Sequence, residues 1–407
     1  MIMWLHLLIG IVVLASRLLH GACAAVLRER FEEGSESRRN SGGSGVIAPK
    51  VFILDAFDAE GEAWQNIPEF DLLSHNVTVP GLSPLFPAAH CTHDGSICQV
   101  ITGEGAINAA STVSSLVHSP FFDLTHTYFL IAGIAGVNPK LATIGAVTFA
   151  RYAVQVTLQY EIDAREKPAD FPTGYVPQGA RAPDEYPATL YGTEVFEVND
   201  ALRQHALAFA RRATLVDTPA AQAYRAHYAS DTQFAKGAAA PTVVACDTAT
   251  SDAFWSGTLL AEAFENTTRL FTNGSAEYCT TQQEDNGILG ALVRGARSDL
   301  VDFSRIIVMR TASDFDRPYA GQSAAVNLFL GLSGFEASIA NIRTAGVEVV
   351  LGIVEGWEVT FREGVHATNY VGDILGSIGG EPDFGPGSVF EDQQAPFGRR
   401  GRVGMTA

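Results

Sequence analysis

The sequence is poor in long apolar segments and in basic residues. Beyond residue 25, charged residues and Gly-Pro breaks interrupt every apolar stretch before the 20 or so residues that a membrane span needs. We therefore do not expect a carrier or channel that threads a membrane several times. The 407 residues include 27 Lys and Arg against 45 Asp and Glu. This acidic balance disfavours nucleic acid polymers and anionic lipid surfaces as partners and favours a neutral small molecule.

The sequence also lacks a recognisable metal site. Zinc ligands recur in closely spaced Cys and His pairs that converge on one ion. We find no such ligand spacing among the histidines, including His90, His93, His126 and His366. We therefore predict no metal and no other cofactor.

Cysteine is scarce, with five in the chain and one of these, Cys23, in the N-terminal segment. Four cysteines in an oxidising compartment suggest two disulfides. Cys91 and Cys98 flank a His-Asp-Gly-Ser segment and could close a hairpin, and Cys246 and Cys279 would then pair. Four buried free thiols are the alternative for a cytosolic protein.

The N-terminal residues are typical of a targeting segment. Trp4 to Ser16 is a short apolar run, and Ala22-Cys23-Ala24 supplies the small residues of a cleavage site. Met1-Ile2-Met3 carries no basic side chain, so an uncleaved signal anchor is the alternative. We predict a signal peptide over 1–25, a disordered linker over 26–46, a folded domain over 47–395 and a flexible tail over 396–407.

Export is also indicated by three N-glycosylation sequons, which begin at Asn76, Asn266 and Asn273. We predict a secreted or cell-surface glycoprotein. Membrane association through the signal anchor, and assembly into a homo-oligomer, stay open.

Apolar runs alternate with helical patterns from about Pro49 onward. Strands are expected at 51–54, 97–102, 128–132, 146–149, 242–246 and 305–309. Helices are expected at 106–117, 201–212, 252–264, 287–293 and 322–343. This alternation predicts an α/β sheet that binds ligands at the carboxyl ends of its strands, with residues 165–240 as an elaboration.

Six short motifs lie at the expected strand ends and helix starts. Glycine or acidic turns place flexible backbone where main-chain amides can approach a ligand. The motifs are Phe52–Glu60, Thr102–Ala110, Ile131–Gly136, Thr250–Phe254, Gln283–Asp285 and Met309–Asp314.

In this order and spacing, the motifs resemble the nucleoside phosphorylase and nucleosidase superfamily, and within it the fungal purine nucleoside permeases. The resemblance runs from about Pro49 to about Gly380. It implies a single three-layer α/β domain in which helices flank a central mixed, twisted sheet. It also implies a purine nucleoside as the ligand.

The resemblance assigns roles to residues of the motifs. Glu60 would hold the attacking water, and Asp314 would protonate or hydrogen-bond N7 of the leaving base. Glu284 would grip the ribose 2′- and 3′-hydroxyls, and Phe254 would lie against the purine. The remaining candidate substrate-binding residues are Gly133, Ala135, Gly136, Ser313 and Asp285.

These residue types suit the cleavage of an N-glycosidic bond. The reaction builds positive charge on the sugar and negative charge on the base, so a carboxylate near the sugar and a proton donor at N7 both lower the barrier. One carboxylate can also accept both hydroxyls of a diol. Each residue has a structural alternative: Glu60 as a solvated loop acid, Asp314 as a cap, Glu284 as a first-turn helix acid and Phe254 as core.

Two departures from the superfamily bear on the reaction. Gln283 and Asp285 replace the usual Met and small residue around the ribose acid, which adds a charge there. No arginine lies just before or within Ile131–Gly136, where phosphate-using members carry one, and Arg151 lies well downstream. We therefore predict a hydrolytic nucleosidase. A nucleoside-binding component of uptake and a phosphorylase are the alternatives.

Overall fold

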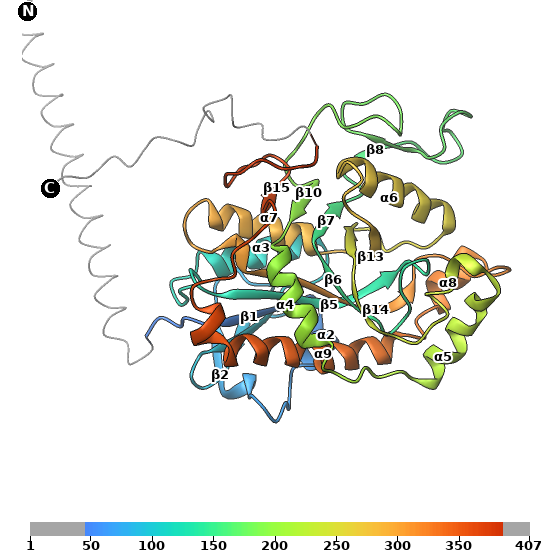
Figure 1. The fold of residues 1–407 in the computed structure, drawn as a ribbon. Coiled ribbons are helices and arrows are strands. Elements are labelled where there is room, and N and C mark those ends of the chain that lie inside the picture. Colours follow the sequence, from blue (N-terminus) through green and yellow to red (C-terminus); the bar gives the residue numbers. More distant parts are fainter. Residues whose placement is uncertain (1–44, 386–407) are drawn as a thin grey trace, which may run out of the picture. The chain divides into compact units, whose positions relative to one another are not determined.

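The computed structural model describes residues 45–385. The predicted signal peptide, nearly all of the predicted linker and the predicted tail lie outside the described residues. The described chain forms one large mixed sheet with helices on both faces, as Figure 1 shows. This confirms the predicted fold class.

The sheet follows the order β15-β10-β7-β12-β13-β5-β1-β4-β3-β2, and β14, β6 and β11 join it through β5. β5 pairs in parallel with β1 and β14 and antiparallel with β13, which makes the sheet mixed. A separate ribbon pairs β8 with β9. The strands are β1 (Val51–Asp55), β2 (His75–Thr78), β3 (Ala88–Cys91), β4 (Ile97–Ile101), β5 (Tyr128–Val137), β6 (Val147–Ala150), β7 (Tyr152–Gln155), β8 (Gln159–Glu161), β9 (Tyr175–Pro177), β10 (Val195–Glu197), β11 (Val243–Ala245), β12 (Asp247–Thr250), β13 (Tyr278–Gln282), β14 (Ile306–Phe315) and β15 (Gly372–Asp373).

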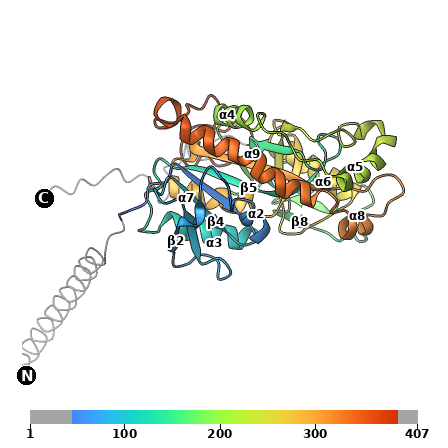
Figure 2. The same ribbon diagram turned by 90° about the horizontal axis from the view of Figure 1, so that it is seen from below.

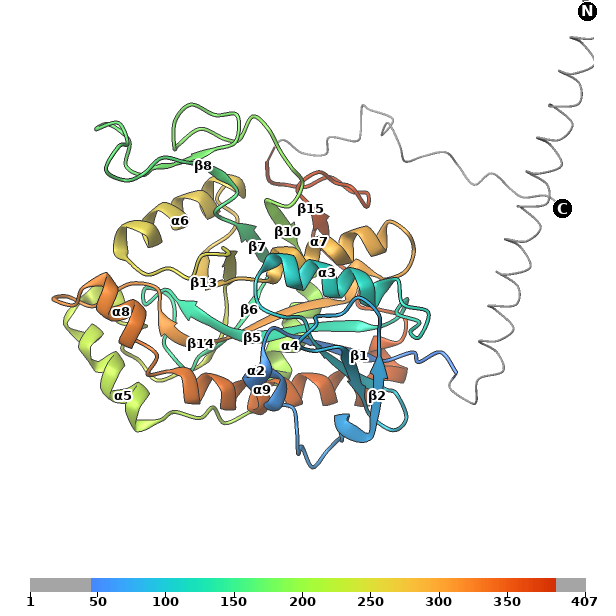
Figure 3. The same cartoon turned by 180° about the vertical axis from the view of Figure 1, so that it is seen from behind.

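Helices cover the two faces because successive strand residues point to opposite sides. In β1, Val51 and Ile53 belong to one apolar cluster, whereas Phe52 and Leu54 belong to another. α4 and α9 pack on the first side, as Figure 2 shows, and α3 and α7 lie together on the second, as Figure 3 shows. The helices are α2 (Asp58–Glu62), α3 (Ala106–Val117), α4 (Asp200–Ala210), α5 (Pro219–Arg225), α6 (Thr258–Phe271), α7 (Asp285–Ala296), α8 (Ala324–Leu330) and α9 (Phe335–Glu355).

Two predicted helices were placed wrongly. The helix expected over 252–264 begins only at Thr258, because residues 252–257 form a loop beside the cavity described below. The helix expected over 322–343 is divided into α8 and α9 by the segment Gly331–Gly334. Two strands are also longer than predicted, since β5 and β14 continue through their motifs as paired backbone.

Both proposed disulfide pairings are confirmed. Cys91–Cys98 joins β3 to β4, and Cys246–Cys279 joins the chain before β12 to β13. All four cysteines are buried. Disulfides of this kind are typical of proteins that fold in an oxidising compartment.

α9 is long and apolar enough to span a membrane, alone among the helices that the structure describes. In its most apolar window, 56% of the residues are buried inside the fold. Its buried Asn341 donates to Gly145 O at 2.8 Å and accepts from Val216 N at 2.7 Å. These contacts and its packing on β5 and β14 make it a core helix of this sheet.

Candidate active site

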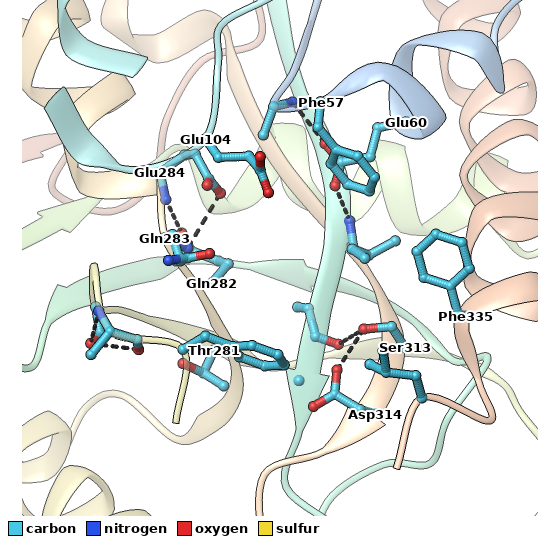
Figure 4. A pocket seen from close by; sticks show the side chains of 18 residues that line it. Phe57, Glu60, Glu104, Thr281, Gln282, Gln283, Glu284, Ser313, Asp314 and Phe335 are labelled. Carbon is cyan, nitrogen blue, oxygen red and sulfur yellow. Dashed lines mark hydrogen bonds between the residues drawn. The ribbon is translucent and has the colours of Figure 1, made fainter. Parts of the chain in front are cut away.

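A cavity of about 270 Å³ opens where β1, β5, β13 and β14 end (Figure 4). Its lining includes Phe57, Leu332 and Phe335 as apolar surfaces and no Lys, Arg or His. Seven of the predicted site residues line it, namely Glu60, Ala135, Gly136, Phe254, Glu284, Ser313 and Asp314. The remaining two, Gly133 and Asp285, lie outside the lining.

Glu60 lies in the single turn of α2, directly after β1, and is buried. Its Oε2 accepts a hydrogen bond from Ala56 N at 2.7 Å, and its Oε1 accepts one from Ile134 N at 2.6 Å. Burial raises the pKa of Glu60 to about 8, and the positive charge of Arg310 only partly opposes that rise. Glu60 is therefore not a solvated loop acid, because its carboxyl group is buried and held in place.

Asp314 lies near the end of β14 and faces the cavity. The Ser313 hydroxyl donates to Asp314 Oδ1 at 2.7 Å, which leaves Oδ2 for a ligand. Burial raises the pKa of Asp314 to about 6, while the bond from Ser313 works against that rise. A carboxyl group with this pKa exchanges a proton readily near neutral pH.

Glu284 lies just before α7 and is anchored by the glycine turn that precedes α3. Gly105 N donates to Glu284 Oε1 at 3.0 Å. Gln282 Oε1 in turn accepts from the N–H groups of Glu284 and Asp285, each at 2.8 Å, so it takes the place of a cap at the start of α7. Burial raises the pKa of Glu284 above its ordinary value.

Arg310, which our sequence analysis missed, neutralises part of this acidic cluster. Its Nη2 lies 2.5 Å from Asp285 Oδ1 and 3.3 Å from Glu284 Oε2, and its Nη1 donates to Ile134 O at 3.1 Å. Burial alone would lower the pKa of Arg310, but Asp285 and Glu284 raise it above the ordinary value. The signal was available, because a lone arginine within the apolar strand Ile306–Phe315 must find a buried partner.

Asp285 and Gly133 lie outside the cavity lining, but each is next to a charged group of the site. Asp285 is fully buried and directs Oδ1 to Arg310, so its charge is paired and it does not line the cavity. A Cβ at Gly133 would lie 2.6 Å from both Glu60 Oε1 and Arg310 Nη1. Glycine therefore leaves the space that these two groups occupy.

Arg151 does not reach the cavity. Its Nη2 lies 2.5 Å from Glu197 Oε1, and its backbone N–H donates to Asp247 Oδ1 at 3.0 Å. It lies between β6 and β7 and is absent from the cavity lining. Arg151 therefore supplies no positive charge to the cavity lining.

The chain belongs to the purine nucleoside permease family, because the family model "Purine nucleoside permease (NUP)" matches residues 48–366. A purine nucleoside permease from Candida albicans is 45% identical over 346 residues, which cover 84% of each chain. A Schizosaccharomyces pombe protein, "Probable purine nucleoside permease", is 39% identical over 322 residues, covering 77% of this chain and 91% of that one. The predicted resemblance to the fungal purine nucleoside permeases is confirmed.

Solved structures are more distant. The 5′-methylthioadenosine/S-adenosylhomocysteine nucleosidase from Neisseria meningitidis is 15% identical and aligns with 76% of this chain and 99% of its own, with a TM-score of 0.44. The futalosine hydrolase of Helicobacter pylori is 16% identical, with coverage of 76% and 98% and a TM-score of 0.43.

Proposed function

We propose that this protein binds a purine nucleoside in the cavity and hydrolyses its N-glycosidic bond. One observation carries the proposal: the cavity sets the carboxyl groups of Glu60 and Glu284 at one end and that of Asp314 at the other. This separation matches the two charges that develop when the bond breaks.

Glu284 and Glu60 serve the sugar end. Glu284, held by the Gly105 amide, accepts hydrogen bonds from the 2′- and 3′-hydroxyls. Glu60, held by the Ala56 and Ile134 amides, takes a proton from water as the water oxygen attacks C1′. Both carboxylates also stabilise the positive charge that develops on the sugar ring.

Asp314 serves the base end. As the bond between C1′ and N9 breaks, its electron pair moves into the purine, and Asp314 delivers a proton to N7. Ser313 fixes the orientation of the carboxyl group through Oδ1. The products are the free base and ribose, with the proton lost by water balancing the one gained by the base.

Water suits this cavity better than phosphate as the nucleophile. Phosphate carries close to two negative charges, and the lining contains no cationic side chain. Arg310 lies nearby, but its Nε, Nη1 and Nη2 already have protein acceptors in Asp285, Ile134 and Glu284. Only one N–H of Nη1 is left for a phosphate, and Arg310 is absent from the cavity lining.

A second candidate is a nucleoside-binding component of uptake that does not cleave its ligand. The specific observation in its favour is that the relatives at 45% and 39% identity are named permeases. This candidate uses the same cavity and differs from the enzyme only in the fate of the bond.

Product analysis separates these functions. Purified protein is incubated with inosine, guanosine and adenosine, in phosphate-free buffer and with excess phosphate. We expect free base and ribose under both conditions. Ribose 1-phosphate that forms only with phosphate would make this a phosphorylase. Nucleoside binding in calorimetry without any cleavage would establish the uptake component.

A further inference from the structure

The turn Gly103-Glu104-Gly105 carries a carboxylate that the proposed hydrolysis does not use. Glu104 lines the cavity and is solvent-exposed, and its carbonyl oxygen accepts a hydrogen bond from Asn108 Nδ2 at 2.8 Å. The next residue, Gly105, donates its N–H to Glu284 Oε1. The turn therefore holds Glu104 beside the residue that would bind the ribose diol.

The position of Glu104 relates it to one end of the ligand. In Figure 4, Glu104 lies near Glu284, whereas Asp314 lies at the opposite end of the cavity. A nucleoside with its base at Asp314 and its diol at Glu284 extends its C5′ group away from the base. Glu104 adds a further acidic side chain to the lining at that end, beside Glu284.

We infer that Glu104 recognises the 5′ group of the nucleoside and selects nucleosides over nucleoside 5′-phosphates. The inference rests on the proposed placement of a purine nucleoside in this cavity. A carboxylate accepts a hydrogen bond from a 5′-hydroxyl and pairs with a 5′-ammonium group. It repels a 5′-phosphate.

The surrounding charges strengthen this selection. The lining holds four acidic residues, Glu60, Glu104, Glu284 and Asp314, and no cationic one. A 5′-phosphate would bring nearly two more negative charges next to Glu104 and Glu284. Specificity of this kind depends on an unfavourable contact with the wrong ligand as much as on a good contact with the right one.

Calorimetry with the full chain tests the inference on four ligands: adenosine, 5′-deoxyadenosine, 5′-amino-5′-deoxyadenosine and adenosine 5′-monophosphate, with the matching inosine series. We expect 5′-deoxyadenosine to bind about tenfold more weakly than adenosine, because one hydrogen bond is lost. The monophosphate should bind about 100-fold more weakly or worse. The 5′-amino ligand should bind at least as tightly as adenosine.

Two variants assign the effect to Glu104. Glu104→Gln keeps an acceptor and removes the charge, so it should bind adenosine within about threefold of wild type and gain about tenfold or more for the monophosphate. It should also lose any preference for the 5′-amino ligand. The matched control is Glu62→Gln, which removes an exposed acid of α2 that does not line the cavity. This control should leave the ligand order unchanged.

The outcomes separate this inference from the proposed hydrolysis. Equal binding of adenosine and 5′-deoxyadenosine, or equal changes in both variants, would overturn the role of Glu104 while leaving hydrolysis intact. The expected ligand order without any base release would support Glu104 and refute hydrolysis. If no nucleoside binds at all, both proposals are wrong.

Discussion

Arg310 and Asp285 form a buried ion pair, with Nη2 and Oδ1 2.5 Å apart and both side chains almost inaccessible to solvent. The same guanidinium group reaches Glu284 Oε2 at 3.3 Å. One cation thus links the start of α7 to β14 and balances part of the charge on the acids around the cavity.

The first prediction concerns this pair. Arg310→Met should lower the free energy of unfolding by about 3–5 kcal/mol, because it leaves Asp285 buried without a partner. Urea unfolding measures the loss. The double variant Arg310→Met, Asp285→Asn removes the stranded charge and should recover part of it. An Arg310→Met variant as stable as wild type would show that the pair is not needed.

The second prediction concerns the space at Gly133. Gly133→Ala places a methyl group 2.6 Å from Glu60 Oε1 and Arg310 Nη1, so the Glu60 carboxyl group must move. We expect turnover to fall about 10- to 100-fold, with about 1–3 kcal/mol of lost stability. Gly290→Ala is the control, since the nearest contact there is the flexible end of Arg294 at 3.2 Å. Equal activity in the two variants would refute the role of Gly133.

The third prediction tests the general acid. Asp314→Asn should keep most of the nucleoside affinity and lose about 10²- to 10⁴-fold in turnover, because an amide cannot deliver a proton. Steady-state kinetics measures the loss of turnover, and calorimetry measures the affinity that is kept. The loss should be smaller for nitrophenyl riboside, whose leaving group needs less protonation. Equal impairment on both substrates would mean that Asp314 is not the acid.

The fourth prediction is the pH dependence of kcat/KM. Asp314, with its pKa raised to about 6, must be protonated, and Glu60, with its pKa raised to about 8, must be ionised. The productive form is the fraction of protein in which Asp314 is protonated and Glu60 is ionised. This fraction is level at about 1% between pH 6 and pH 8, and it falls about tenfold per pH unit below pH 6 and above pH 8. In Glu60→Gln the low-pH fall should vanish, and the decline should begin at pH 6 instead of pH 8. A wild-type profile that is flat from pH 4 to 9 would contradict both assignments.

The fifth prediction concerns export. The asparagines of the three sequons, Asn76, Asn266 and Asn273, are all exposed in the structure. We expect protein secreted from a eukaryotic host to carry N-linked glycans, so digestion with an amidase specific for such glycans should lower its mass. Replacing each asparagine by Gln identifies the occupied sites. An unchanged mass would count against passage through the secretory pathway.

The sequence by itself determined the fold class, the disulfide pairs and seven residues of the cavity lining. Apolar runs and helical patterns are local properties, so they can be read without knowing distant contacts. The motif acids could be expected to meet because parallel strands bring their carboxyl ends to one edge of the sheet. Glu60 and Asp314 lie in one cavity for this reason, although 254 positions separate their numbers.

Only the tertiary structure decided which side chains surround these acids. The register of β5 against β14 sets Arg310 opposite Gly133 and Asp314 opposite Gly136. A shift of one residue would turn each of these side chains to the other face of the sheet, and no local pattern fixes that choice. The same long-range packing keeps Asp285 out of the cavity lining and brings Glu104 beside Glu284.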